Sequence, residues 1–291
     1  GRGHDRISVA ASRFPGAKTT VLISDALDDP EVQAFLVLVP PATRLALVTR
    51  IAESGRHMLL EKPLEADTER AMGVVRAARD AKVKLAVMLQ HRVRPAALEL
   101  TRLVQEGQLG RIISASVVVP WWRDQTYYDE PGRGTRARDG GGVLLTQAIH
   151  QIDLLIQIVG LPAKVTAFSA TSAAHRMQCE DIAAAAMQWS DGAVGYLFAT
   201  TAAAPGFPER ISVTGTKGTA LLTSSHLRIF YEDGRVEAHG DADPVPGGGG
   251  ASARPMAFSN DGHLTVLTDF LDAIEADRPP LIDGMGVLKA H

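Results

Sequence analysis

The stretch "HMLLEKPLE" (residues 57–65) joins a short apolar run to an abrupt polar end, Glu61-Lys62-Pro63. A proline disfavours the α conformation for the residue before it, so we expect Lys62 to continue the extended chain. In an open α/β sheet, ligands bind beyond the carboxyl ends of the strands, and Lys62 would lie at such an end. The same tripeptide is equally typical of a solvated Glu-Lys pair at an ordinary turn. The sequence on either side distinguishes the two interpretations.

The sequence around this stretch alternates between strand and helix patterns. Predicted strands cover residues 34–39, 57–60 and 83–89, and predicted helices cover residues 42–54, 67–81 and 95–107. Short, nearly continuous apolar strands separated by helices are typical of a parallel sheet covered on both faces. We therefore predict an α/β domain of the doubly wound, nucleotide-binding type over residues 1–92. Lys62 would lie at its ligand-binding edge.

The remainder, residues 93–291, has the pattern of an α+β domain. A buried helix is predicted over residues 143–159 and an amphipathic helix over 263–280. Predicted strands cover residues 165–172, 181–189, 193–201, 210–215 and 219–223. The turns "SDG" (190–192) and "GTKG" (215–218) join strands into hairpins, so the sheet is expected to be mainly antiparallel, and "PVPGGGGASARP" (244–255) is expected to be a surface loop. Helices are available for only one face of this sheet, so the other face is expected to be apolar and to form a dimer or tetramer.

Composition excludes several classes of protein. The chain has 291 residues, of which 45% are apolar and 22% charged, as in globular proteins. A net charge of −3 without a basic cluster speaks against a nucleic-acid partner. No apolar run is long enough to cross a membrane and no signal peptide is apparent. The single cysteine, Cys179, is interpreted as a packed core thiol rather than a nucleophile, and it favours a reducing, cytoplasmic location.

Residues 143–159 carry the most informative polar pattern. Thr146, His150, Asp153 and Gln157 would form a polar stripe on one face of an otherwise apolar helix. Such a stripe either satisfies polar groups in the core or lines a wet cavity. The glycines at 140–142 would leave backbone N–H groups at the helix start, which could hold substrate oxygens.

Two further stretches are candidate site segments. "LVPPATR" (38–44) would form the turn between a strand and a helix at the same sheet edge as Lys62, or simply a proline-rich helix start. "VPWWRDQTYY" (119–128) crowds aromatic side chains around Arg123. This crowding is typical of an interface or of a wall that contacts a sugar.

Together, "PPATR", "EKPL", "GGGVLLTQAIHQIDLL" and the hairpin "SDGAVGYLF" occur in an order and spacing that resembles the glucose–fructose oxidoreductase/inositol dehydrogenase (Gfo/Idh/MocA) family. The resemblance covers nearly the whole chain. It implies a Rossmann-type dinucleotide-binding domain followed by an α+β domain with a large open sheet. It also implies NAD or NADP as cofactor, and hydride transfer to or from a hydroxyl-bearing carbon of a sugar, sugar derivative or cyclitol. A homodimer or homotetramer formed through the sheet face is the implied assembly.

The resemblance also implies roles for individual residues. Lys62 and His150 would be catalytic, His150 as the base and Lys62 as the charge that stabilises the developing alkoxide. The implied cofactor-binding residues are Pro40, Pro41, Arg44, Glu61, Lys62, Pro63 and Gln90. The implied substrate-binding residues are Lys62, Trp122, Arg123, Thr146, His150 and Asp153. No metal is implied.

Two departures from the family pattern are expected to matter. Many members carry an aspartate four residues before the histidine, where this chain has Thr146. The chain also begins "GRGHDRISVAASRFPGA", without the strand and Gly-x-Gly-x-x-Gly turn that bind the pyrophosphate. Residues 7–14 resemble the helix that follows the second strand, so we expect a first strand–helix–strand unit, or a stretch between His4 and Asp5, to be missing here. "VLKAH" at the other end lies within a predicted helix. NAD and NADP therefore cannot be distinguished.

Two other functions fit the same pattern. One is a non-catalytic regulator that senses a cofactor or sugar, which the Thr146 departure favours but the presence of Lys62 and His150 argues against. The other is a sugar hydrolase or lyase that uses NAD transiently.

Overall fold

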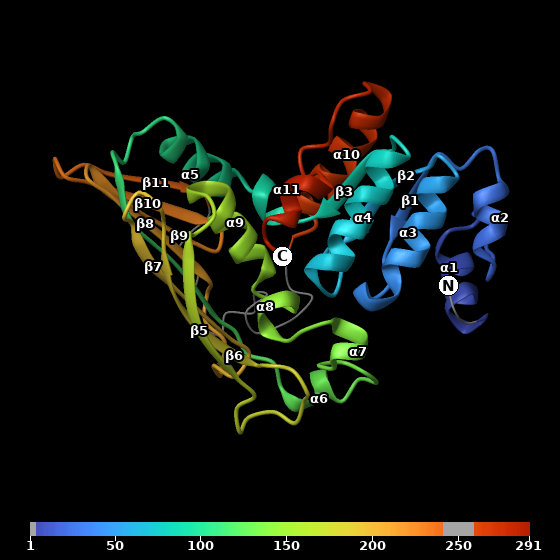
Figure 1. Ribbon diagram of the computed structural model, residues 1–291, viewed down its shortest axis with the longest axis horizontal. Helices are drawn as coiled ribbons and strands as arrows, with labels where there is room; N and C mark the ends of the chain where they lie inside the picture. Colours follow the sequence, from blue (N-terminus) through green and yellow to red (C-terminus); the bar gives the residue numbers. More distant parts are fainter. Residues whose placement is uncertain (1–3, 241–258) are drawn as a thin grey trace.

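The computed structural model describes residues 4–240 and 259–291, which form two sheets with their helices (Figure 1). The first sheet has three parallel strands in the order β1-β2-β3. They are β1 (Ala34–Val37), β2 (His57–Glu61) and β3 (Leu85–Met88). The predicted strands are confirmed, and all three end at one edge of the sheet. Lys62 follows the last residue of β2 directly.

Helices connect these strands and supply the core of the first sheet. The 3-10 helix η1 (Pro41–Thr43) leads into α3 (Arg44–Glu53), and α4 (Thr68–Asp80) connects β2 to β3. Two further helices, α1 (His4–Arg13) and α2 (Ile23–Asp28), precede β1. The Asp67 side chain caps α4 by accepting from the backbone N–H of Arg70.

The second sheet has eight strands in the order β11-β10-β9-β8-β4-β7-β6-β5. The strands are β4 (Ile112–Pro120), β5 (Lys164–Ala170), β6 (Ile182–Gln188), β7 (Val194–Thr200), β8 (Arg210–Gly215), β9 (Gly218–Thr223), β10 (His226–Tyr231) and β11 (Val236–Gly240). All described pairs are antiparallel except β4–β7, so the predicted mainly antiparallel sheet is confirmed. The predicted hairpins at residues 190–192 and 215–218 join β6 to β7 and β8 to β9. Strands β10 and β11 were not predicted, and the predicted loop at 244–255 lies outside the described residues.

Helices cover one face of this sheet. The helices α5 (Pro95–Gln105) and α9 (Ile149–Val159) pack on the side that faces the first sheet (Figure 1). On the opposite face, Phe168, Ala184 and Phe198 lie side by side on β5, β6 and β7. Phe168 is 81% exposed and Tyr196 on the same face is 49% exposed. The predicted apolar surface on this face is therefore present in the described chain.

The predicted continuous helix over residues 143–159 is wrong. The chain forms α8 (Val143–Thr146) and then α9, and the axis bends by 50° between Arg136–Thr146 and Ile149–Val159. The reason is a slip in the hydrogen-bond ladder, because the N–H groups of Gln147 and Ala148 both donate to the carbonyl of Val143. Thr146 therefore does not continue the face of α9 that carries His150 and Asp153.

The last described helices return to the first sheet. Helix α10 (Asp261–Glu275) ends five residues before the predicted limit, and α11 (Gly284–Leu288) follows it. Phe270 and Ile282 belong to the same buried cluster as strands β2 and β3, and Val87 donates its N–H to the carbonyl of Ile282 at 3.0 Å. The division at residue 92 stays a prediction. Helices α10 and α11 lie in the part of the chain assigned to the second domain, but they pack against the first sheet.

Two short helices, α6 (Gln125–Tyr128) and α7 (Arg136–Asp139), lie on the segment that leads from β4 to α8. The connection from β3 to α5 is a 3-10 helix, η2 (Gln90–Val93). In the part of the chain that the structure describes, no single helix is long and apolar enough to span a membrane. One bent pair, Arg136–Thr146 with Ile149–Val159, passes that test by length and composition.

A buried ion pair joins η2 to α9. The Arg92 guanidinium donates to both oxygens of Asp153 at 2.7 and 2.5 Å, and it also donates to the carbonyl of Gly286 on α11. The side chains of Arg92 and Asp153 are 10% and 1% exposed.

Removing one partner of this pair is expected to be much more destabilising than removing both. We predict that Arg92→Met lowers the free energy of unfolding by about 3–5 kcal/mol, because the Asp153 carboxylate stays buried without its cation. The double variant Arg92→Met/Asp153→Leu should lose less. Urea unfolding measures both, with Arg79→Met as control, since Arg79 pairs with Asp80 on the surface and should lose less than about 1 kcal/mol. Equal losses in Arg92→Met and Arg79→Met would contradict the prediction.

Candidate active site

The turn after β2 is held by a buried arginine. Arg44, the first residue of α3, is 1% exposed. Its Nη1 donates to the carbonyls of Glu61 at 2.6 Å and Leu64 at 3.2 Å and makes a short contact with the carbonyl of Pro63, while Nη2 donates to Val39 at 2.7 Å. Burial lowers the pKa of Arg44 to about 10 although Glu61 and Glu65 oppose the shift. Both terminal nitrogens of the Arg44 guanidinium are thus occupied by the backbone, and the assignment of Arg44 to cofactor binding stays a prediction that these contacts do not support.

Lys62 crosses from this turn to the second half of the chain. Its Nζ donates to the backbone carbonyl of Thr146, the last residue of α8, at 2.6 Å. The Lys62–Pro63 peptide bond is cis. Burial lowers the pKa of Lys62, Glu61 opposes this, and the positive charges of Arg123 and Arg133 lower the pKa further.

His150 lies on the first turn of α9 and is 6% exposed. Its ring stacks on His91 of η2, with 4.5 Å between ring centroids and 21° between the planes. Burial lowers the pKa of His150 well below its ordinary value, and the charges of Lys62 and Arg94 add to the effect. Its Nδ1 is buried and has no hydrogen-bond partner among the described residues. The imidazole is therefore neutral at pH 7 and able to accept a proton.

Lys62 and His150 line one cavity of about 230 Å³ between the two sheets. Its described lining residues are Glu61, Lys62, Gln90, His91, Arg94, Trp121, Arg123, Tyr127, Thr146, Gln147, His150 and His263. These residues come from the ends of β2, β3 and β4, from η2, α6, α8 and α10, and from the start of α9. Lys62 therefore lies at the carboxyl edge of the first sheet, as predicted, and lines a cavity there.

Several predicted site residues lie elsewhere. Asp153 is bound to Arg92 and does not line the cavity, because its carboxylate is occupied within the core. Trp122 is also outside the lining, where Trp121 takes its place, since successive residues of an extended chain point to opposite sides. Pro63 is buried in the turn behind Lys62.

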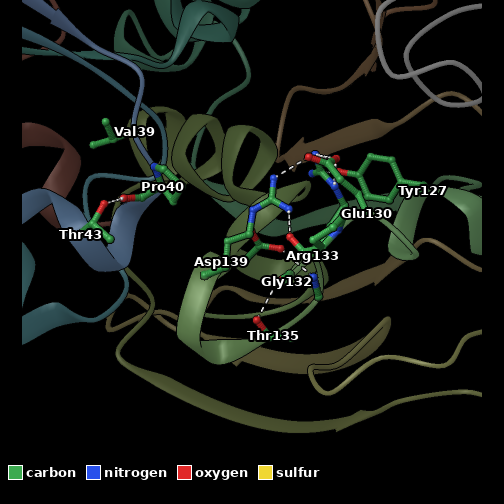
Figure 2. A network of polar contacts seen from close by, with 12 residues as sticks. Val39, Pro40, Thr43, Tyr127, Glu130, Gly132, Arg133, Thr135 and Asp139 are labelled. Carbon is green, nitrogen blue, oxygen red and sulfur yellow. Dashed lines mark hydrogen bonds and ion pairs between the residues drawn. The ribbon is translucent and has the colours of Figure 1, made fainter. Parts of the chain in front are cut away.

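The proline turn lies beside the cavity rather than in its wall. Pro40 and Pro41 are absent from the lining, and Pro41 is buried at the start of η1. Figure 2 shows Val39, Pro40 and Thr43 facing the segment that carries Tyr127 and Asp139, and η1 contacts α7. In that segment, Arg133 donates to the Tyr127 hydroxyl at 2.9 Å and forms an ion pair with Glu130.

The start of α8 does not offer the N–H groups of Gly142 and Val143 to a substrate. The N–H of Gly142 donates to both carboxylate oxygens of Glu180 at 3.1 Å, and the N–H of Val143 donates to the Glu180 carbonyl at 2.8 Å. A side chain at Gly142 would collide with the Glu180 backbone, with a Cβ 1.8 Å from its oxygen. Glycine at 142 is required for close packing, and Glu180 occupies the helix start.

Sequence reasoning missed six lining residues: His91, Arg94, Trp121, Tyr127, Gln147 and His263. The signal for His91 was available, because it follows the strand predicted over residues 83–89 just as Lys62 follows β2. Trp121 and Tyr127 lie within the aromatic stretch at residues 119–128, which the sequence indicated as a candidate site segment. His263 could not have been found, since its place depends on the return of α10 to the first sheet.

Residues 4–89 match a family model described as "Oxidoreductase family, NAD-binding Rossmann fold", and residues 97–221 match the "GFO/IDH/MocA C-terminal domain". The chain belongs to the GFO/IDH/MocA oxidoreductase family. The predicted combination of a Rossmann-type domain and a large mainly antiparallel sheet is thereby confirmed.

Individual members of the GFO/IDH/MocA family resemble the chain over most of its length. It is 28% identical to a 1,5-anhydro-D-fructose reductase of Ensifer adhaerens, over 94% of this chain and 81% of the relative. It is 26% identical to a D-xylose dehydrogenase of Paenarthrobacter nicotinovorans, over 83% of this chain and 61% of the relative. The structure of the WlbA dehydrogenase from Bordetella pertussis, in complex with NADH and UDP-GlcNAcA, has a TM-score of 0.81 and 29% identity, over 98% of this chain and 82% of that chain. The chain spans 58% and 61% of the length of the first two curated relatives.

The cavity suits the reactive end of a nicotinamide cofactor. Gln90 lies at the carboxyl end of β3, and its Oε1 is buried without a hydrogen-bond partner among the described residues. A buried carbonyl oxygen of this kind calls for a donor such as a carboxamide N–H. Burial raises the pKa of the neighbouring Glu61. Among the described residues no cluster of three or more histidine, cysteine, aspartate and glutamate side chains is arranged to hold a metal ion.

Thr146 lines the cavity without adding a charge, at the position where the family resemblance led us to expect an aspartate. Its Oγ1 donates to the carbonyl of Gly142 at 2.6 Å and makes a short contact with Oε1 of Gln147. Thr146 and His150 both line the cavity even though the helix is broken between them.

This arrangement predicts how His150 titrates. Because its pKa is lowered, His150 should take up a proton only at pH values below the ordinary histidine pKa of about 6.5. Thr146→Asp adds a negative charge that stabilises the imidazolium, so the pKa should rise. NMR of ¹⁵N-labelled histidine measures both, with Gln105→Asp at the exposed end of α5 as control. If Thr146→Asp left the titration of His150 unchanged, its carboxylate would not face the imidazole.

Proposed function

We propose that the protein is an NAD(P)-dependent oxidoreductase that transfers a hydride between the nicotinamide and a hydroxyl-bearing carbon of a sugar, sugar derivative or cyclitol. The observation that carries this proposal is the convergence of Lys62 and a neutral, buried His150 on one cavity. The relatives of the chain support it, because they include a D-xylose dehydrogenase, an inositol 2-dehydrogenase and a 1,5-anhydro-D-fructose reductase. Structures of the WlbA dehydrogenases, 29% and 26% identical, contain NADH.

The nicotinamide supplies the redox chemistry when it is bound. Glu61, Lys62 and Gln90 at the carboxyl ends of β2 and β3 would hold its reactive end. The substrate hydroxyl would lie between Lys62 and His150. As the hydride leaves the carbon, His150 accepts the hydroxyl proton.

Lys62 acts through its charge. One of its three N–H donors is bound to the Thr146 carbonyl, and two remain for the substrate oxygen. The ammonium stabilises the negative charge that develops on this oxygen more than it stabilises the neutral hydroxyl.

The lowered pKa of His150 also bears on the direction of the reaction. An imidazolium formed beside Lys62 and Arg94 releases its proton readily, since the positive charges of these two residues destabilise the protonated ring. In reverse, the same imidazolium is a strong acid toward a carbonyl oxygen. The cavity therefore supports carbonyl reduction as well as alcohol oxidation.

A panel of activity assays distinguishes the proposed oxidoreductase from the two alternative functions. Full-length protein is incubated with sugars and cyclitols and either NAD⁺ or NADP⁺, while reduced nicotinamide is followed by absorbance. Net reduction supports the oxidoreductase. Turnover without net reduction would indicate the NAD-assisted hydrolase or lyase, and binding without turnover would indicate the sensing regulator.

Loss of either catalytic candidate should lower turnover. We expect His150→Ala to lose roughly 10²–10⁴-fold in kcat, the usual effect of removing a general base. Lys62→Ala should also lose activity, while Lys62→Arg retains the charge and should recover part of it. Steady-state kinetics measures these changes, with His239→Ala on the exposed strand β11 as control. Full activity in His150→Ala would exclude His150 as the base.

We also propose a homodimer or homotetramer formed through the uncovered face of the large sheet, and a cytoplasmic location. The apolar side chains of this face, such as Phe168 and Tyr196, support the assembly. The single cysteine, Cys179, is consistent with a reducing compartment.

A charge placed in this face should dissociate the assembly. Phe168→Asp is expected to convert the oligomer to a monomer, because a carboxylate would be buried without a partner. Light scattering at micromolar concentration measures the mass, with Leu264→Asp as control, since Leu264 is 63% exposed on α10. A wild-type monomer, or dissociation by both variants alike, would contradict an interface on this face.

A further inference from the structure

His91 lies against the proposed base His150 and lines the same cavity. The two rings are stacked, with 4.5 Å between their centroids and 21° between their planes, and each residue is 6% exposed. His91 lies on η2 after the carboxyl end of β3, and His150 lies on the first turn of α9. The proposed hydride transfer assigns His91 no part, so the reason for this buried stack has to come from its contacts.

The stack is the contact that orients the His150 ring. In a catalytic histidine, a hydrogen bond to one ring nitrogen ordinarily fixes how the ring is turned and which nitrogen carries the proton. In His150, Nδ1 is buried and has no hydrogen-bond partner among the described residues. The flat contact with His91 therefore takes the place of that hydrogen bond.

Gln151 determines the protonation state of His91. Its Nε2 lies 2.9 Å from Nδ1 of His91, and Gln151 is 3% exposed. An amide nitrogen can only donate, so Nδ1 of His91 accepts this hydrogen bond and the proton of the neutral ring is on Nε2. A protonated His91 would turn an N–H group toward the amide N–H and lose the bond. Gln151 therefore favours the neutral ring.

The charges around His91 act mainly in the same direction. Burial lowers the pKa of His91 well below its ordinary value. The elements around His91 each bring a group that lowers this pKa further: His150 from α9, Arg94 from the junction of η2 and α5, Lys62 from the turn after β2, and His263 from α10. Glu61 is the carboxylate among the described lining residues of the cavity. His91 is therefore neutral at pH 7.

A proton taken up by the stacked pair is expected to stay on His150. Two imidazolium rings with centroids 4.5 Å apart would repel each other, and burial strengthens such repulsion. If His91 held the proton instead, its charge would make His150 a poorer base for the hydroxyl of the substrate. By favouring a neutral His91, Gln151 leaves His150 free to accept that proton.

Resting on the proposed function, we propose that His91 is a positioning residue: Gln151 holds it as a neutral imidazole with its proton on Nε2, and in this state it fixes the ring of His150 and leaves the proton of the substrate to His150. The O–H bond of the substrate breaks and an N–H bond forms on His150, while His91 neither gains nor loses a proton. The alternative, that His91 and Gln151 only satisfy each other as buried polar groups, is an outcome of the test.

NMR of ¹⁵N-labelled histidine in the full chain tests the protonation states without any substrate. We expect His91 to carry its proton on Nε2 and to stay neutral at every pH at which His150 is neutral. In Gln151→Glu, the new carboxylate accepts from Nδ1 of His91 and should raise the proton affinity of His91 about 10- to 1000-fold, so that His91 is protonated before His150.

Gln157→Glu makes the same chemical change at an exposed position of the same helix, α9, and should leave the protonation of His91 unchanged. A wild-type His91 with its proton on Nδ1, or one that is protonated before His150, would overturn the proposal without reference to any variant. A Gln157→Glu variant that changes His91 as strongly as Gln151→Glu would also overturn it, because the contact with Gln151 would then not be the cause.

Steady-state kinetics tests the positioning of His150, with NAD⁺ or NADP⁺ and the sugar or cyclitol that the activity assays identify. His91→Ala should lower kcat up to about 100-fold and change KM much less, as expected when a reacting group is displaced. His91→Phe retains a neutral flat ring against His150 and should recover most of kcat. Equal losses in the two variants, or full activity in His91→Ala, would overturn the positioning role.

The two experiments keep this inference separate from the proposed function. If no sugar supports nicotinamide reduction while NMR shows His91 neutral with its proton on Nε2, the oxidoreductase is excluded and the protonation states of the histidine pair stand. If nicotinamide is reduced while His91 carries its proton on Nδ1 or is protonated before His150, the oxidoreductase stands and the proposed role of His91 is excluded.

Discussion

The buried guanidinium of Arg44 is the contact on which the geometry of the site depends. A charged group can be buried only where hydrogen bonds replace its water, and the carbonyls of Val39, Glu61, Pro63 and Leu64 do this. These carbonyls belong to the chain after β1 and to the turn after β2. One cation therefore fixes two strand ends at once, and the position of Lys62 follows from it. An arginine on the surface could not fix the two strand ends in this way, because water would compete for its N–H donors.

From that turn, the site is assembled by contacts that cross between the two sheets. Lys62 donates to the Thr146 carbonyl, and a helix end has carbonyls to offer because its last turn lacks intrahelical partners. The break between α8 and α9 thus has a function in the packing, since Thr146 is the last residue of α8. Arg92 and Asp153 form a second link, between η2 and α9. A third link is the close approach of two backbones at Gly140 and Ala66. A Cβ added at Gly140 would lie 2.7 Å from the Cα of Ala66 and would clash with it.

The sequence predicted the elements whose pattern is local. The alternation of apolar strands and helices, the hairpin turns at 190–192 and 215–218, and the place of Lys62 at a sheet edge all follow from spacing and turn chemistry. The break at Gln147 could not be predicted, because the apolar period continues through it and because Glu180, which binds the N–H of Gly142 at the start of α8, is 38 residues away from Gly142 in the chain. Asp153 and Arg44 look like ligand-binding residues in sequence, and only the structure shows that Asp153 is bonded to Arg92 and Arg44 to backbone carbonyls. Trp121 and Trp122 are indistinguishable until the register of β4 is known.

The threonine at residue 146, where an aspartate was expected, affects the charge around Lys62 and His150. A carboxylate at this position would lie near Lys62 and His150, raise the pKa of both and offset one of the positive charges. A threonine instead supplies its backbone carbonyl to Lys62 and adds no charge. Because residue 146 brings no carboxylate to offset it, the charge of Lys62 acts on His150 and adds to the lowering of the His150 pKa that burial causes.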